Sequence, residues 1–133
     1  MLTKELLWLT LTVAMTGLLW VPYILDRIMV RGAMGATANP SPTDKPQSAW
    51  AQRMIAAHTN SVENLVVFAP LVLTAQALNI HTASTAFACA LFFWCRLIYV
   101  AVYTAGIPVV RTLAFAGGWI GQMILVLAIF GMM

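Results

Sequence analysis

The fold is decided by the stretch from Thr82 to Thr104, which reads TASTAFACALFFWCRLIYVAVYT. A helix crosses a bilayer with about 20 apolar residues, so this stretch is long enough to span. Arg96 is its only charged residue. An ionisable side chain at membrane depth costs about 2.5 kcal/mol or more, so it usually faces a partner, a cavity or a ligand. We therefore expect a transmembrane helix whose arginine has a specific role.

The composition of the whole chain predicts the same class of protein. Hydrophobic residues make up 62% and charged residues 8% of the chain, and the mean hydropathy is +0.88. Soluble domains are about a quarter charged, so this composition predicts an all-α integral membrane protein. The 133 residues leave room for one domain, 1–133, of about four spans. Hydropathy places the spans at about 5–29, 49–79, 82–104 and 108–130, with one long polar loop at about 30–48.

The distribution of positive charge predicts the orientation. Arginine and lysine residues flank the long loop and the connection between the third and fourth spans, whereas Lys4 is nearly alone at the other side. Basic residues favour the cytoplasmic side, so both termini should face away from the cytoplasm. We expect a bacterial inner membrane. The net charge of +3 reflects this asymmetry and does not indicate nucleic-acid binding.

The cysteines and histidines are expected to be structural. Cys89 and Cys95 would lie about 120° apart on a helix and about 9 Å apart in rise, too far for a disulfide. Neither His58 nor His81 has a second histidine or a carboxylate at metal-ligand spacing. We therefore expect free thiols, packing histidines and no metal site.

Polar side chains form one stripe on each of two apolar helices. At 100° per residue, Arg53, Asn60 and Asn64 fall within about 40°, and Glu63 lies about 60° further round. Arg96, Tyr99 and Tyr103 fall within about 60° on the third helix, and Arg111 begins the fourth. Taken singly, the arginines can snorkel to lipid phosphates and the tyrosines can belong to an interfacial belt. Together with the deep carboxylate of Glu63, they favour a binding site.

We call the residues of these two stripes, together with Arg111, the polar strip. The residue types in this strip indicate the class of ligand. Guanidinium groups bind carboxylates, Glu63 can accept from an ammonium group, and Asn60 can pair with peptide amides. The complementary molecule is small, zwitterionic and peptide-like, and it enters from the cytoplasm. Glutathione has this pattern of groups.

These motifs resemble the MAPEG family, the membrane-associated proteins in eicosanoid and glutathione metabolism. The first block is Ala38-Asn39-Pro40, Arg53, Ala57-His58, Asn60 and Glu63; the second is Arg96, Tyr99, Tyr103, Gly106, Pro108 and Arg111. The resemblance covers nearly the whole chain. It implies a four-helix protomer in a homotrimer, with glutathione between neighbouring subunits near the cytoplasmic face.

Residue roles also follow from the resemblance. Carried over by position, the residues that would hold glutathione are Arg31, Asn60, Glu63, Arg96, Tyr99 and Tyr103, with Arg53 in support. Arg111 matches the arginine that family members place near the glutathione sulfur. The chain departs from prostaglandin E synthase at Ala56 and Thr59, where that enzyme has arginines, and at Thr112, where it has serine.

The expected activity is that of a glutathione transferase or peroxidase. A neighbouring cation lowers the pKa of a thiol, so Arg111 would stabilise the thiolate, with Tyr103 as a hydrogen-bond donor. The thiolate would attack a lipophilic electrophile or hydroperoxide that arrives through the bilayer. Two alternatives remain open: a non-enzymatic membrane protein of the same fold, and a small proton-coupled transporter that depends on Glu63.

Overall fold

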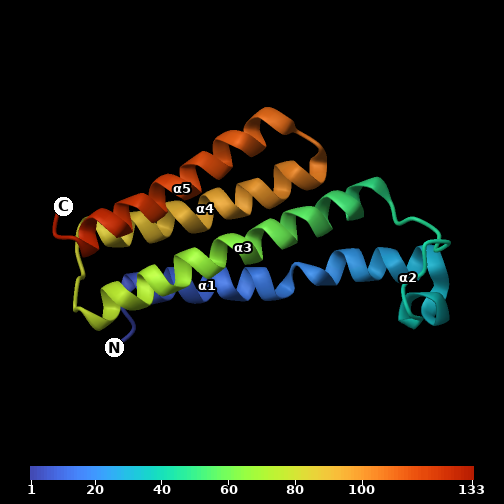
Figure 1. The fold of residues 1–133 in the computed structure, drawn as a ribbon, viewed down its shortest axis with the longest axis horizontal. Coiled ribbons are helices and arrows are strands. Elements are labelled where there is room, and N and C mark those ends of the chain that lie inside the picture. The colour runs from blue at the N-terminus through green and yellow to red at the C-terminus, as the bar shows by residue number, and fades with distance from the viewer.

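The computed structural model describes residues 1–133, and all of its regular secondary structure is helical. α1 (Lys4–Leu18) and α2 (Trp20–Thr37) follow one another nearly in line, and α3 (Ala49–Ala77) runs back beside them (Figure 1). α4 (Ala83–Ala105) and α5 (Pro108–Ile129) form a hairpin that packs against this pair. The predicted helical membrane bundle is confirmed, with α1 and α2 together forming its first long segment.

Three segments are long and apolar enough to cross a membrane: Lys4–Thr37, Ala83–Ala105 and Pro108–Ile129. α3 is longer than α4 or α5, but polar side chains along it lower its hydropathy and it is not among the three. That α3 also crosses the membrane stays a prediction. Both termini and the α3–α4 connection lie at one end of the bundle, opposite the α4–α5 turn (Figure 1).

The first long segment differs from the predicted span at two places. α1 ends at Leu18 because Pro22 has no N–H to donate to the Leu18 carbonyl group. Helical residues then extend to Thr37, beyond the predicted end at Met29, so the first part of the loop predicted at 30–48 is helical on both sides of a break at Gly32. Gly32, with φ +71°, breaks the helix within this range, and the residues that follow it form a separate short helical piece across a kink.

The remaining loop is fastened to α2 by hydrogen bonds. The buried carboxylate of Asp26 accepts from the backbone N–H of Ser48 at 3.1 Å and from Gln47 Nε2 at 3.2 Å. Further along α2, Arg31 donates to the Lys45 carbonyl at 2.8 Å and pairs with Asp44 at 3.4 Å. The loop therefore has a defined path back to the start of α3.

The α4–α5 hairpin is close-packed through glycines of α5. A Cβ atom on Gly121 would lie 2.8 Å from the Ala88 carbonyl oxygen, and one on Gly117 would lie 2.6 Å from Cys95 Sγ. Small residues let helix backbones approach closely in membrane proteins. Gly106, with φ +82°, ends α4, and Pro108 begins α5 two residues later.

The buried side chains form two clusters along the bundle. One is centred on Phe68 and Phe92, whose rings stack at 3.8 Å, and the other on Tyr99, Met54 and Ala114. Only 27 of the 133 residues are buried, while large side chains such as Trp94, Trp119 and Phe130 are exposed. An apolar exterior of this kind suits lipid or neighbouring subunits. Both cysteines are free, as their spacing predicts.

Candidate functional site

Arg96 is the most completely buried charged side chain in the structure, with 1% of its surface exposed. It projects from α4 toward α3, where its Nη2 donates to Asn60 Oδ1 at 2.7 Å and to Ser61 Oγ at 3.2 Å. Its guanidinium carbon lies 4.2 Å from the centre of the Tyr99 ring on the same helix. These contacts hold the guanidinium group in one orientation.

The remaining donors of Arg96 are unpaired. Nε and Nη1 are buried and make no hydrogen bond, and no carboxylate pairs with this arginine. A buried donor without a partner costs about 1–3 kcal/mol, and more when it is charged. The chain therefore holds a positive group in place whose charge and hydrogen-bonding capacity it does not itself satisfy.

A second cation lies along the same strip. Tyr99 and Tyr103 pack edge to face, with ring centres 5.6 Å apart. The guanidinium carbon of Arg111, at the start of α5, lies 4.3 Å from the centre of the Tyr103 ring. The order along the hairpin is thus Arg96, Tyr99, Tyr103 and Arg111, and the structure brings these four predicted site residues together.

Asn60 and Asn64 continue this arrangement onto α3. Asn64 Nδ2 donates to the Asn60 backbone carbonyl at 2.9 Å and to Asn60 Oδ1 at 3.3 Å. Because Oδ1 of Asn60 also accepts from Arg96, its amide nitrogen points away from both partners. The Asn60 Nδ2 group is therefore free to donate to another molecule.

Sequence reasoning missed two members of this network. Ser61 accepts from Arg96, and the buried Gln122 of α5 donates from Nε2 to the Asn64 carbonyl at 3.2 Å. Gln122 carried a signal, since it is the only strongly polar side chain in the apolar run from Leu113 to Ile129. A buried amide in such a run needs a hydrogen-bond partner. Ser61 carried none, because a lone serine beside Asn60 is unremarkable.

Arg53 and Arg31 have partners within the chain. Arg53 Nε donates to the Thr104 carbonyl at 2.9 Å and so completes the hydrogen bonding at the end of α4. Arg31 fastens the loop through Lys45 and Asp44, and none of its hydrogen bonds reaches the Arg96 group. Their contact with a ligand stays a prediction, and their observed contacts are structural.

Glu63 lies at the edge of the strip, beside a separate pocket. It is exposed and makes no hydrogen bond or ion pair within the chain. A pocket of about 350 Å³ is lined by Glu63, His58, Thr59, Val62 and Tyr23. His58, which the sequence predicts to be a packing residue, forms a hydrogen bond between its Nδ1 atom and the Tyr23 hydroxyl group at 2.8 Å. The single chain thus leaves the carboxylate of Glu63 open to a ligand or a neighbouring subunit.

The arrangement is suited to binding an anion beside an amide donor. It offers two guanidinium groups, two tyrosine rings and a free amide nitrogen, with a carboxylate at one edge. The structure contains no cluster of three or more histidine, cysteine, aspartate or glutamate residues that could hold a metal ion.

Comparison with known proteins identifies the family of the chain. The family model described as MAPEG family matches residues 6–131. Neither the curated proteins nor the solved structures gave a significant match. The matched range includes every residue of the strip and the three helices that carry them, α3, α4 and α5.

Proposed function

Because the chain belongs to the MAPEG family, we propose that it is a membrane-bound, glutathione-dependent transferase or peroxidase. The observation that supports this most directly is the state of Arg96. Its guanidinium group is buried, and two of its nitrogen donors have no hydrogen-bond acceptor within the chain. Carboxylate and carbonyl oxygens of glutathione would accept from Nε and Nη1, one oxygen at each donor, in charge-assisted hydrogen bonds. The burial of the charge would then be compensated only in the complex.

The other residues have complementary roles in this proposal. Asn60 would donate from its free amide nitrogen to a glutathione carbonyl or carboxylate, and Glu63 would accept from the ammonium group. Tyr99 and Tyr103 would line the site, with Arg53 and Arg31 supporting its walls. Because Glu63 is exposed in the single chain, a neighbouring subunit of a homotrimer would close the site around it.

Arg111 would activate the thiol group of glutathione. A cation close to a thiol favours the thiolate form, and Arg111 is held over the Tyr103 ring in a position to do so. In conjugation, a sulfur–carbon bond forms, the leaving group departs with its electron pair, and the thiol proton is released to water. In peroxidase turnover, two thiols are oxidised to a disulfide while the hydroperoxide is reduced to an alcohol and water.

The two substrates would arrive from different phases. The polar strip lies toward the end of the bundle that holds the α4–α5 turn, which we assign to the cytoplasm of a bacterial inner membrane (Figure 1). The lipophilic substrate would reach it from the bilayer across the exposed apolar residues at the start of α5, which include Val110, Leu113 and Phe115.

The test is a titration of glutathione into the detergent-purified protein, followed by the ultraviolet absorbance of the thiolate. We expect a saturable signal in the wild type and its loss in Arg111→Ala, with glutathione binding by calorimetry reduced less than tenfold. Binding without any thiolate signal in the wild type would favour a non-enzymatic protein of this fold. No binding by the folded wild type would contradict the proposal.

A further inference from the structure

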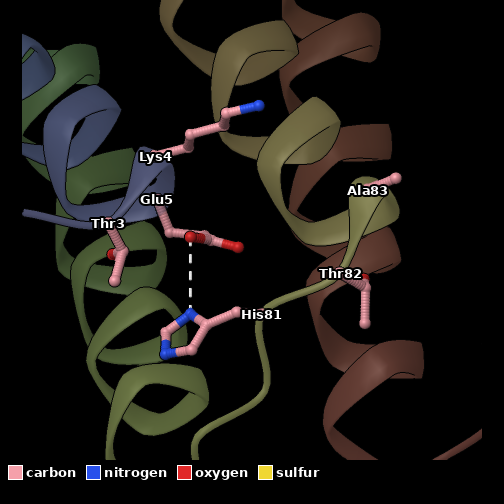
Figure 2. A pocket seen from close by; sticks show the side chains of 6 residues that line it. All are labelled: Thr3, Lys4, Glu5, His81, Thr82 and Ala83. Atoms are coloured by element: carbon pink, nitrogen blue, oxygen red, sulfur yellow. Dashed lines mark ion pairs between the residues drawn. The ribbon is translucent and has the colours of Figure 1, made fainter.

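Two pockets of the structure each contain one carboxylate, and the two carboxylates differ in their partners. At the end of the bundle that holds both termini, Glu5 is 3% exposed, accepts from Thr85 Oγ1 at 2.6 Å and pairs with Nδ1 of His81 at 3.4 Å. Figure 2 shows Glu5 and His81 pointing toward one another. Glu63 is exposed in its own pocket and has no partner within the chain. Only the Glu63 pocket therefore leaves a carboxylate open to a ligand.

The lining of the Glu63 pocket indicates the charge of its occupant. The pocket has a volume of about 350 Å³, which lies in the range of small-ligand pockets, and is lined by Tyr23 of α2 and by His58, Thr59, Val62 and Glu63 of α3. None of these residues is a lysine or an arginine, and the Thr59 hydroxyl group already donates to a backbone carbonyl of its own helix at 3.1 Å. An ammonium group is the charged partner that this lining fits best.

Tyr23 and His58 form a hydrogen-bonded pair in the wall of this pocket. The Tyr23 hydroxyl group and His58 Nδ1 lie 2.8 Å apart, and the two rings are tilted by 47° with centres 5.8 Å apart. Because these two polar atoms bond to one another, neither of them takes the Glu63 carboxylate as a partner. The face of a tyrosine ring attracts a cation, so this wall also suits an ammonium group.

Tyr23 is held through its backbone as well as its side chain. Its carbonyl group accepts from Gln47 Nε2 at 2.7 Å, and the same nitrogen donates to the carboxylate of Asp26 at 3.2 Å. Gln47 is buried at the end of the long loop. The Tyr23 ring is thus tethered at both ends, by the loop through its backbone and by His58 through its hydroxyl group.

The pocket is continuous with the polar strip along α3. Asn60 and Glu63 are three residues apart, and side chains at this spacing on a helix are neighbours, with Cβ atoms about 5–6 Å apart. Asn60 accepts from Arg96 at 2.7 Å and has a free amide nitrogen. A ligand that contacts Arg96 and Asn60 therefore reaches Glu63 within one turn of α3.

We propose that Tyr23 is a specificity-determining residue, which together with His58 fixes the wall of the Glu63 pocket so that the site selects thiol peptides with a free ammonium group. This inference rests on the proposed function. Glu63 would pair with the ammonium group and the Tyr23 ring would line it, while His58 acts through Tyr23 and is a positioning residue. A ligand whose amino group is missing would leave the Glu63 carboxylate covered and without a partner, which is costly.

The first test compares two ligands by calorimetry on the full chain in detergent: glutathione, and glutaryl-cysteinylglycine, which is the same peptide without the amino group. We expect the wild type to bind glutathione at least tenfold more tightly. Equal affinity for the two would overturn this inference and leave the proposed function standing. No binding of either ligand by the folded wild type would overturn both.

The second test removes the hydroxyl group that holds the wall. Tyr23→Phe keeps the ring but loses the bond to His58, so glutathione affinity should fall about fivefold, the effect of one hydrogen bond, while affinity for glutaryl-cysteinylglycine stays the same. The control is Trp20→Phe, which changes an exposed aromatic residue of α2 outside the pocket and should keep the wild-type preference. Equal weakening of both ligands by Tyr23→Phe would overturn the inference.

The third test addresses the pairing of Tyr23 with His58. His58→Leu should reduce the preference for glutathione as Tyr23→Phe does, and the double variant should reduce it no further, because both changes remove the same bond. His58→Asn should retain most of the preference, since its amide places a polar atom near the position of Nδ1. A lower melting temperature with an unchanged preference in these variants would show that the pair only stabilises the fold and would overturn the inference.

Discussion

Arg96 and Glu5 are both charged and almost wholly buried, yet they lie at different ends of the bundle and differ in their partners. Both oxygens of Glu5 are satisfied, by Thr85 and by His81. Arg96 is satisfied through one nitrogen only, and its two other donors have no acceptor. A buried charge with a full set of partners holds helices together, whereas one with an incomplete set marks the place of a ligand. The comparison distinguishes a buried charge whose partners all lie within the chain from one that leaves two donors for a ligand.

The largest effect that would sharpen this comparison is expected for Arg96→Met. Loss of a charged, buried contact to glutathione should cost about 4 kcal/mol, roughly a thousandfold in affinity by calorimetry. Because the apolar replacement removes an unpaired buried charge, the melting temperature should stay the same or rise. Arg27→Met, on α2 and outside the strip, is the control and should bind normally. A large fall in melting temperature with retained binding would make Arg96 structural.

Glu5→Ala should have the opposite profile. Removal of one member of a buried pair typically costs about 3 kcal/mol, so unfolding in detergent should occur at a clearly lower denaturant concentration. Glu5→Gln should cost less, since its amide oxygen can still accept from Thr85. The folded fraction of either variant should bind glutathione with wild-type affinity. A loss of glutathione binding in folded Glu5→Gln would break the distinction between the two charges.

The smallest effect is expected for Gln122→Leu. Gln122 makes no hydrogen bond with Arg96, but it donates to the backbone carbonyl of Asn64, whose side chain in turn donates to Asn60. The loss of this link should weaken glutathione binding about tenfold while the thiolate signal at saturation stays intact. Met123→Leu, the half-buried neighbour, is the control. If Gln122→Leu lowers only the melting temperature and leaves affinity unchanged, the amide serves packing and not the site.

Helical periodicity was sufficient to predict the strip and insufficient to predict how its arginines are used. Offsets along one helix placed Arg96, Tyr99 and Tyr103 on a common face, and the structure brings them together with Arg111. Periodicity does not show which carbonyl groups lie nearby. Arg53 and Arg31, whose contact with a ligand stays a prediction, donate to the Thr104 and Lys45 carbonyl groups within the chain. Only the folded chain reveals these backbone acceptors.

The polar cluster around Glu5 was not predictable for a related reason. Its partner Thr85 is 80 residues away in sequence, and the other partner, His81, lies in the short connection before α4, where its spacing predicts only a packing role. The glycines Gly32 and Gly35 predicted a loop from about residue 30; Gly32 does break the helix, with φ +71°, but the residues after it form a further short helical piece that ends at Thr37.

The hydrogen bonds between α3 and the α4–α5 hairpin have a consequence for how the bundle finds its register. Lipid solvates apolar helix surfaces about as well as another helix does, so apolar contacts alone allow two helices to slide along each other. Three polar links occur at different heights: Arg53 with Thr104, Asn60 with Arg96, and Asn64 with Gln122. A shift of one helical turn, about 5.4 Å, would break all three at once. The residues of the proposed site therefore also fix the position of α3 along the α4–α5 hairpin when the helices assemble. A chain whose helices pack out of register cannot form the site.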